Sequence, residues 1–492
     1  HRQYPDADWS LPEEWLTPLA AVGERLRPPL ATELHRWLFD SWRPDIGVSV
    51  RDDFAAFETE LQHAREDAVV QILNEQGFGA VTDLAITVQL PWAVGSALAS
   101  VNNEHDYEAL SLLDSEDARL VQFADGFARR RGGGAVTAIR PWVERFVGRP
   151  LLQARLLQTV ADVTNAWELI PDLGTDVEKA YWAEFVPYGR GADFPHASEV
   201  ARQLIRHGRA AMAIDALSLY AERLADGMDA HIVLDALTQL GTVEDPEIGR
   251  VSEHDLTTLL DYLRSRGVDE TEVARLEWKF LPALHHESRA PSLQRLLARD
   301  PATFVQLIEL AFKPASSEAR REPRDVDRNL ASNAYKLLRE WRVVPGTRED
   351  GSVDAAALQG WLDEVRALLT HSDRLEIGEL QVGEVLAHSP TDPDGTFPTR
   401  SVREVLESVP NDRLERGFMI GLYNKRGVTS RGMTEGGKQE YDLAKRYERW
   451  AEAVEATYPR TAGALRSVAA SYREDGRRND EEARRFLEGL DR

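Results

Sequence analysis

Hydrophobic residues recur along most of the chain with the spacing of amphipathic α-helices. Three clear sets place apolar side chains at positions i, i+3, i+4 and i+7: Leu256, Leu259, Leu260 and Leu263; Phe304, Leu307, Ile308 and Ala311; Leu465, Val468, Ala469 and Tyr472. Each set forms an apolar stripe on one helix face. Alternation with a period of two is rare, and its best case, residues 81–90, also fits a buried helix. The pattern therefore predicts an all-α protein.

Start and stop signals divide this pattern into helices of about 10–20 residues joined by short polar turns. Asp300 before Pro301 has the form of an N-cap and first-turn proline, and Ser252 with Asp255 has that of a capping box. Three arginines followed by the glycines of 132–134 indicate a helix end. Short helices with short connections are typical of stacked antiparallel pairs. We therefore expect antiparallel helical hairpins stacked as an α-solenoid.

Two segments match parts of the tetratricopeptide (TPR) spacing. The first places apolar residues before and after a turn at Gly208: Val200, Ala201, Leu204, Ala213 and Leu217. The second runs from Leu465 to Tyr472, with Gly476 at the turn position and a second helix carrying Ala483 and Phe486, displaced by two residues. No period of about 34 residues runs through the chain. We therefore expect a degenerate TPR- or HEAT-like solenoid.

Breaks at 187–195 and 345–352 divide the predicted helices into three regions. These are an N-terminal helical region, 1–190, a middle helical-repeat region, 191–350, and a C-terminal helical region with a TPR-like end, 351–492. The chain opens with His1, so we expect a fragment or a processed product of a longer protein.

Composition narrows the class of protein. With 42% hydrophobic residues, the 492-residue chain can bury a sizeable core. The 83 acidic residues exceed the 59 basic ones, giving a net charge of −24, which argues against a general nucleic-acid coat. The chain has no Cys, which excludes disulfides and thiolate chemistry and favours a reduced cytoplasm. No apolar run of about 18 residues predicts a membrane span.

Several motifs that would carry chemistry are incomplete. Residues 432–439 match a phosphate-binding loop except that Gln439 replaces the magnesium-binding Ser or Thr, and a predicted helix precedes them. We interpret them as a glycine-rich turn before a helix. Three triplets combine His with acidic residues, at 104–106, 253–255 and 285–287. The residues within each triplet are consecutive, so on a helix their side chains point in different directions and cannot face one metal ion. The calcium-like stretch 392–395 has Arg403 where the loop needs Glu. We therefore expect no cofactor and no metal.

The twelve Trp have two interpretations. A helical-barrel glycosidase would line a cleft with Trp and carry two carboxylates, which the sequence does not single out. Five aromatic residues fit packing between helices, which we favour: Trp167, Tyr181, Trp182, Trp278 and Trp341. Others remain candidates for partner contacts.

One loop near the C-terminus is basic in an acidic chain. The candidate binding residues are Asn424, Lys425, Arg426, Thr429, Ser430 and Arg431, with Arg400 and Arg403 on the preceding helix. Glycine with hydroxyl and cationic side chains suits an anion or an acidic partner. The competing interpretation, favoured by the surplus of acids, is that these cations pair with the protein's own carboxylates.

The C-terminal region also carries a pattern of glycines, aromatics and polar residues. It comprises Ile377-Gly378-Glu379, Val382-Gly383, Leu386-Ala387, Asp394-Gly395, Pro398, Gly417-Phe418, Asn424, Arg426 to Arg431, Gly436-Gly437, Gln439-Glu440, Leu443-Ala444 and Pro459-Arg460-Thr461-Ala462. Residues of about 150–492 thereby resemble the helical recognition region of large bacterial multidomain proteins, including signal-transducing ATPases of antiviral defence. The resemblance implies a sensor module whose catalytic parts lie outside this chain.

These observations favour a non-catalytic protein-interaction or sensor module in the cytoplasm. Its partner would be a protein, and in the defence setting a phage protein. Two alternatives stay open: a helical-barrel carbohydrate-active enzyme, and a nucleic-acid-binding adaptor that uses the cations of 129–149 and 425–431.

Overall fold

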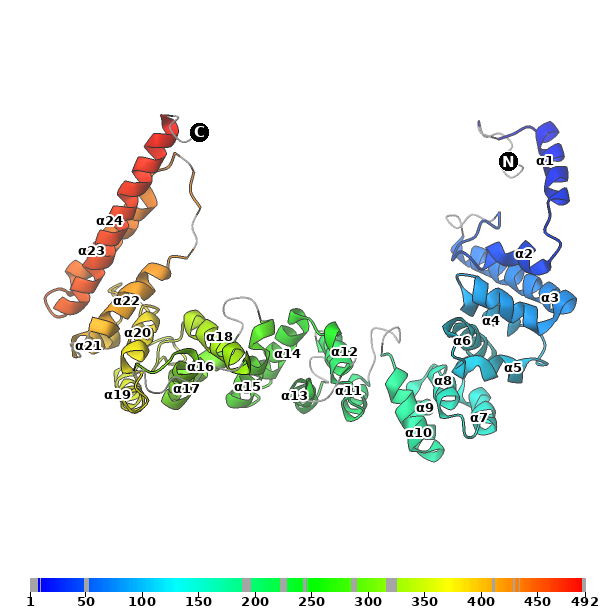
Figure 1. Ribbon diagram of the computed structural model, residues 1–492, viewed down its shortest axis with the longest axis horizontal. Coiled ribbons are helices and arrows are strands. Elements are labelled where there is room, and N and C mark those ends of the chain that lie inside the picture. Colours follow the sequence, from blue (N-terminus) through cyan, green and yellow to red (C-terminus); the bar gives the residue numbers. More distant parts are fainter. Residues whose placement is uncertain are drawn as a thin grey trace. The chain divides into compact units, whose positions relative to one another are not determined.

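The computed structural model is helical throughout the part of the chain that it describes (Figure 1). It describes residues 8, 10–47, 53–187, 196–221, 228–241, 245, 247–284, 290–315, 325–408, 412–427, 430–432 and 434–488. These residues form 24 α-helices, four short 3-10 helices and no β-strand, apart from an isolated bridge between Thr347 and Val353. The predicted all-α class is confirmed.

The chain divides into two compact units, His1–Ala192 and Asp193–Arg492. The helices of the first unit are α1 (Glu13–Arg25), α2 (Ala31–His35), α3 (Phe54–Thr87), α4 (Pro91–Leu98), α5 (Asp106–Ser111), α6 (Ala118–Gly132), α7 (Val136–Arg145), α8 (Pro150–Gln158), α9 (Val163–Leu173) and α10 (Thr175–Glu184). The short 3-10 helices Arg36–Leu38 and Leu112–Asp114 lie between them.

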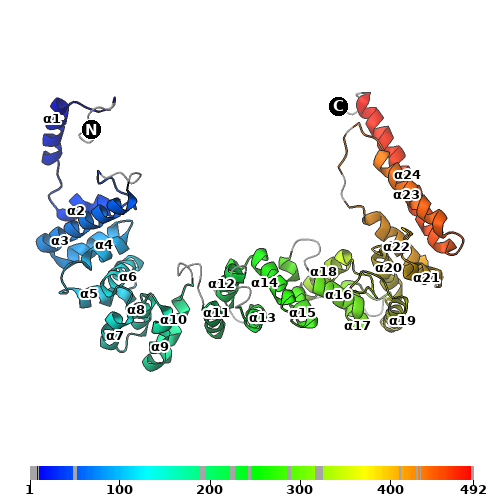
Figure 2. The same cartoon turned by 180° about the vertical axis from the view of Figure 1, so that it is seen from behind.

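The second unit begins with two short helix pairs and ends with a long one. Its helices are α11 (Ala197–Arg206), α12 (Ala210–Ala221), α13 (Ala230–Gln239), α14 (Glu253–Ser265), α15 (Glu270–Phe280), α16 (Pro291–Arg299), α17 (Pro301–Ala311), α18 (Asp325–Glu340), α19 (Ala355–His371), α20 (Leu375–Leu386), α21 (Arg400–Ser408), α22 (Asp412–Asn424), α23 (Lys438–Val454) and α24 (Pro459–Leu487). The 3-10 helices Ile248–Arg250 and Leu281–Ala283 complete the set among the described residues. Helices α23 and α24 lie side by side in both views (Figure 1, Figure 2).

Packing is local in both units. Helices that share extensive contacts are at most three places apart in chain order, as in α3 with α6 and α21 with α24. In the second unit, one hydrophobic core extends from Ala274 to Tyr472. It includes the buried rings of Trp341 and Phe304, whose centroids lie 5.3 Å apart. This core is continuous across the break at 345–352, so helices on both sides of that break stabilise each other.

Glycines allow two pairs of helices to approach very closely. In the first unit, a β-carbon on Gly95 of α4 would overlap the carbonyl oxygen of Phe123, and one on Gly126 of α6 would overlap that of Trp92. The backbones of these two helices are therefore in direct contact. A residue larger than glycine at either position would prevent this close approach.

The same crossing occurs in the second unit. A β-carbon on Gly383 of α20 would overlap the carbonyl oxygen of Leu414, and one on Gly417 of α22 would overlap that of Leu380. In both crossings each glycine faces the carbonyl three residues before the other glycine. The crossings of α4 with α6 and of α20 with α22 are thus equivalent residue by residue.

Local helix signals predicted their elements correctly. Ser252 and Asp255 form the capping box of α14, and Asp300 caps α17 with Pro301 in its first turn. Gly133, with φ of 58°, ends α6. The apolar stripes on α14 and α24 are buried, and residues 81–87 belong to α3 rather than to a strand. The first TPR-like window forms the pair α11 and α12, with Gly208 at φ 76° in the turn.

The second TPR-like window was predicted incorrectly. Gly476 was expected in a turn, but it lies inside the continuous 29-residue helix α24, which also contains Ala483 and Phe486. A β-carbon on Gly437 would overlap the carbonyl oxygen of Gly476. Gly476 therefore allows the start of α23 to approach α24 closely, and it does not end the helix.

Candidate functional site

The predicted binding residues lie on two elements at the C-terminal end of the second unit. Asn424 is the last residue of α22, and Lys425, Arg426, Ser430 and Arg431 follow it in the connection to α23. Arg400 and Arg403 lie in the first turn of α21. Thr429 lies outside the described residues. The site therefore has to be assembled from the contacts of the other seven.

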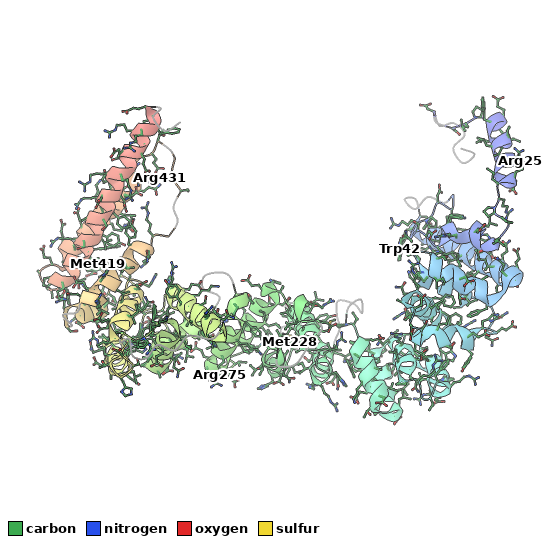
Figure 3. The ribbon with its side chains drawn as sticks, in the orientation of Figure 1. Arg25, Trp42, Met228, Arg275, Met419 and Arg431 are labelled. Atoms are coloured by element: carbon green, nitrogen blue, oxygen red, sulfur yellow. The ribbon has the colours of Figure 1, made fainter. Side chains whose placement is uncertain are left out.

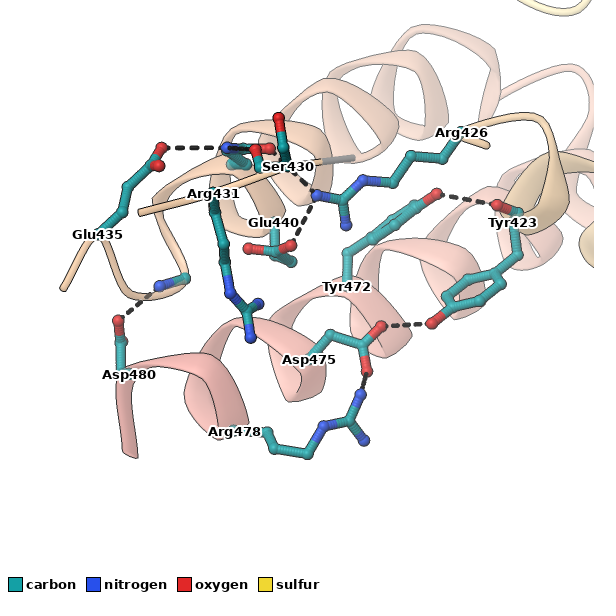
Figure 4. A network of polar contacts seen from close by, with 12 residues as sticks. Tyr423, Arg426, Ser430, Arg431, Glu435, Glu440, Tyr472, Asp475, Arg478 and Asp480 are labelled. Atoms are coloured by element: carbon teal, nitrogen blue, oxygen red, sulfur yellow. Dashed lines mark hydrogen bonds and ion pairs between the residues drawn. The ribbon is translucent and has the colours of Figure 1, made fainter. Parts of the chain in front are cut away.

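Arg426 is held inside the protein. Its guanidinium donates a hydrogen bond of 2.6 Å to Glu440 and lies 5.8 Å from the ring centroid of Tyr472 (Figure 4). Burial is the largest single influence on Glu440 and opposes its ionisation. Hydrogen bonds from Arg426, Asn479 and a backbone amide, together with the charge of Arg426, outweigh burial and leave the Glu440 pKa below its usual value. This pair joins the loop to α23, and the Tyr472 ring joins it to α24.

The network continues along α24. The hydroxyl of Tyr472 donates to the carbonyl of Tyr423 at 3.4 Å, and the hydroxyl of Tyr423 donates to Asp475 at 2.6 Å (Figure 4). Arg478 binds the same carboxylate at 2.5 Å. The end of α22 is thus fixed to α24 by a chain of polar contacts.

The phosphate-loop-like segment is closed by the protein's own carboxylates. The amide of Gly437 donates to Asp480 at 2.8 Å, and the amide of Gly432 donates to Glu435 at 3.2 Å. Helix α23 begins at Lys438 and helix α22 precedes the segment, as the sequence predicted. Amides that would cradle a phosphate in a nucleotide-binding loop therefore already have anionic partners.

Arg431 forms an exposed ion pair with α24. It donates to Glu482 at 2.8 Å, and Figure 3 shows it beside this helix. Both side chains are exposed to water, so the pair contributes little stability. The backbone carbonyl of Ser430 accepts a 3.3 Å hydrogen bond from Gln439.

Arg400 and Arg403 face a different part of the unit. Arg400 pairs with Glu404 on its own helix at 2.8 Å. Arg403 pairs with Asp392, and its guanidinium lies 4.9 Å from the ring centroid of Tyr458. Among the described residues, no hydrogen bond or ion pair links either arginine to the loop 424–432. The structure thus separates these two cations from the others.

The calcium-like stretch forms a turn, as predicted. Gly395 donates to the carbonyl of Asp392 at 2.8 Å, and the Asp392 side chain accepts from Thr399 at 2.6 Å. Because Arg403 also binds this carboxylate, its charge is neutralised inside the protein.

Lys425 is the least compensated of the candidate cations. Its ammonium donates to the carbonyl of Ala387 at 3.2 Å and lies 5.3 Å from the ring centroid of Phe397. Among the described residues, no carboxylate oxygen lies within 4.0 Å of it. Loss of water around the ammonium lowers the Lys425 pKa. An anion bound beside the Lys425 ammonium would compensate for the hydration that burial removes from it.

Lys425 and Arg426 line a cavity of about 450 Å³ that we call the aromatic pocket. Its lining comes from the 388–399 segment, α22, α23 and α24: Ser389, Pro390, Thr391, Phe397, Leu422, Lys425, Arg426, Leu443, Arg446, Tyr447, Trp450 and Tyr472. The Trp450 ring lies 4.8 Å from that of Phe397 and 5.4 Å from that of Tyr447. Sequence reasoning found two of its cations but missed its aromatic wall.

Other expected or possible sites are less developed. In the described part of the chain, no group of three or more His, Cys, Asp or Glu could hold a metal ion, and residues 285–287 lie outside that part. Tyr181, Trp182 and Trp341 are buried as predicted, whereas Trp167 and Trp278 are half-buried. Trp42, labelled in Figure 3, is exposed beside Trp92, with ring centroids 5.7 Å apart. Their pairing across 50 positions was not predictable from spacing.

No protein-family model, curated protein or solved structure matches this chain. In the described part of the chain, no helix has both the length and the apolar character needed to cross a membrane.

Proposed function

We propose that this chain is a non-catalytic protein-interaction module built as an α-solenoid of degenerate helical repeats. The observation that carries this proposal is the repeated glycine crossing, in which Gly95 and Gly126 occupy the same relative positions as Gly383 and Gly417. Recurrence of one helix-pair geometry at both ends of a chain is what a repeat architecture produces.

Local packing supports the same interpretation. Extensive helix contacts stay within three places along the chain, which is how stacked repeats bury their apolar stripes. Stacking of this kind leaves long surfaces and inter-helix grooves exposed along the array, and such surfaces suit recognition of another macromolecule. The resemblance of the C-terminal region extends the proposal. The chain would be the sensor part of a larger bacterial protein of the cytoplasm, with a phage protein as its partner in antiviral defence.

The carbohydrate-active alternative has weaker support. A cavity of the first unit contains Trp42 and Trp92 with Glu58 and Glu66, which superficially suits a sugar. A general acid needs a raised pKa. Burial would raise the pKa of Glu66, but hydrogen bonds from Ser100 and Gln62, together with the charges of Arg130 and His63, outweigh it and keep the pKa below its usual value.

The nucleic-acid alternative also has weaker support, because most of the cations expected to serve it are neutralised. Arg129 pairs with Asp125 at 2.8 Å, and Arg131 pairs with Asp106 at 3.0 Å. Arg149 pairs with Asp114, and Arg426 and Arg431 pair with Glu440 and Glu482. Phosphate binding would require breaking these pairs in a chain of net charge −24.

Two measurements on the purified chain test the proposed function. Incubation with ATP and Mg²⁺ should release no phosphate above buffer and should leave the unfolding temperature unchanged. ATP hydrolysis that disappears in Lys438→Ala would overturn the proposal. Selection from a displayed library of random twelve-residue peptides should yield binders, since an exposed recognition surface accepts short segments. Failure to enrich any peptide over an uncoated surface would also contradict it.

A further inference from the structure

We propose that the aromatic pocket binds an acidic segment of a protein partner that carries a large apolar or aromatic side chain. This inference rests on the proposed function and specifies where a partner docks and what chemistry it presents.

The charge of the pocket lining selects an anion. The lining contains Lys425, Arg426 and Arg446 and no Asp or Glu. Arg426 is neutralised by Glu440, whereas Lys425 and Arg446 form no ion pair with any described carboxylate. The chain has 83 acidic residues, yet all the charged side chains that line this pocket are cations. The pocket is therefore electrostatically complementary to an acidic ligand.

The position of Lys425 indicates where in the pocket the carboxylate of a ligand would bind. An ammonium has three donor hydrogens, and only the bond to Ala387 is formed among the described residues. The ammonium that carries the remaining donors lies 5.3 Å from the centroid of the Phe397 ring, and both residues line the pocket. A carboxylate there would accept a charge-assisted hydrogen bond from a cation that the fold has already partly desolvated.

The wall of the pocket selects an apolar group next to that carboxylate. Phe397 and Tyr447 are buried and fixed, and Trp450 is half-buried between them, with its indole N–H bound to the carbonyl of Gly395 at 3.2 Å. These rings, with Leu422 and Leu443, offer an apolar surface in a cavity of about 450 Å³. Inserted aromatic or large aliphatic side chains gain most from such a surface.

A peptide fits these features better than a nucleic acid does. Single-stranded nucleic acid also combines stacking with anions, but it follows a cationic groove that contacts successive phosphates. The aromatic pocket provides two uncompensated cations, and neighbouring Arg431 is paired with Glu482. One or two carboxylates flanking an apolar side chain match this arrangement.

The test uses the full chain and the library of twelve-residue peptides. Enriched peptides should share an aromatic or large aliphatic residue flanked by Asp or Glu. Their affinity, measured by fluorescence anisotropy, should fall about tenfold or more in Lys425→Met with Arg446→Gln, because charge-assisted hydrogen bonds are lost. Arg449→Gln is the matched control, since Arg449 is exposed on the same helix but does not line the pocket. It should bind as the unaltered chain does, and unfolding temperatures should agree among the variants.

The outcomes separate this inference from the proposed function. Peptides without acidic residues, or peptides that bind the double variant as tightly as the unaltered chain, would overturn the pocket assignment and leave the interaction module standing. A library that yields no binder would overturn both. If the unaltered chain binds a twenty-nucleotide oligothymidine tightly and the double variant does not, the pocket would be assigned to nucleic acid instead.

Discussion

Arg426 and Glu440 form a 2.6 Å ion pair in which the two side chains are only 18% and 4% exposed. The pair spans the connection between α22 and α23, so it fixes the loop that the sequence singled out as a binding candidate. A cation withdrawn in this way supports the loop from inside and does not offer its charge to a ligand.

Replacing Glu440 should therefore affect stability. In Glu440→Gln the Arg426 charge stays buried without its counter-charge, and removal of one partner from such a pair costs about 3 kcal/mol. Chemical unfolding of the purified variant measures this loss as a lower denaturant midpoint with an unchanged slope.

Glu482→Gln is the matched control for this substitution. It removes the carboxylate from the exposed pair with Arg431 and should cost less than about 1 kcal/mol. Equal losses in the two variants would mean that the Arg426 pair is open to water and would contradict its structural role.

The glycine crossings give a second prediction. Gly417→Ala and Gly126→Ala each place a methyl group against a backbone carbonyl that cannot move independently. Each variant should lose about 3 kcal/mol, the upper end for overpacking. Because the two crossings are equivalent, the losses should be similar, each in the unfolding transition of its own unit.

Gly463 provides the comparison within a helix. It is exposed on α24, and a β-carbon there would meet no atom within 4 Å. Gly463→Ala should stabilise the chain by about 0.5–1 kcal/mol through helix propensity. If Gly417→Ala were also neutral or stabilising, the close approach of α20 and α22 would be wrong.

His388 predicts a specific dependence of stability on pH. Burial, with help from Arg342 and Lys425, lowers its pKa from 6.5 to about 3. As pH falls below 6.5, His388 becomes protonated in the unfolded chain but stays neutral in the folded chain. The contribution of neutral His388 to the free energy of unfolding is therefore fully present above pH 6.5 and is lost progressively towards pH 3. Between pH 7.5 and 5.5 this residue should remove about 1.4 kcal/mol.

Comparison with His388→Gln isolates that contribution. The variant should lose about 1.4 kcal/mol less than the unaltered chain over the same pH interval. The same substitution at His371, which is exposed at the end of α19, is the matched control for replacing a histidine. An NMR titration of the His388 imidazole with a midpoint near 6.5 would refute the assigned environment.

Helix boundaries were predictable where the signal lies within a few residues. The capping box of Ser252 and Asp255 involves only its own helix, and so does the cap of α17 at Asp300. Gly476 shows the opposite case. Its role depends on Gly437, which contacts it from the start of another helix, and sequence spacing alone made it a turn.

The candidate site shows the same division. Lys425 and Arg426 were visible as cations without neighbouring acids, but the buried carboxylate of Glu440 reaches Arg426 only after the chain has turned into α23. The aromatic pocket was harder still to foresee. Tyr447 and Trp450 share a helix, yet Phe397 comes from a loop more than forty residues earlier, and no periodicity connects them.

The short reach of the helix contacts also bears on how the protein is made. Each helix finds its main partners among the three helices synthesised just before or after it. Closing such small loops costs little chain entropy, and apolar stripes can be covered while downstream residues are still being added. Nascent chains of intermediate length should therefore already be ordered as they leave the ribosome, without waiting for the terminus.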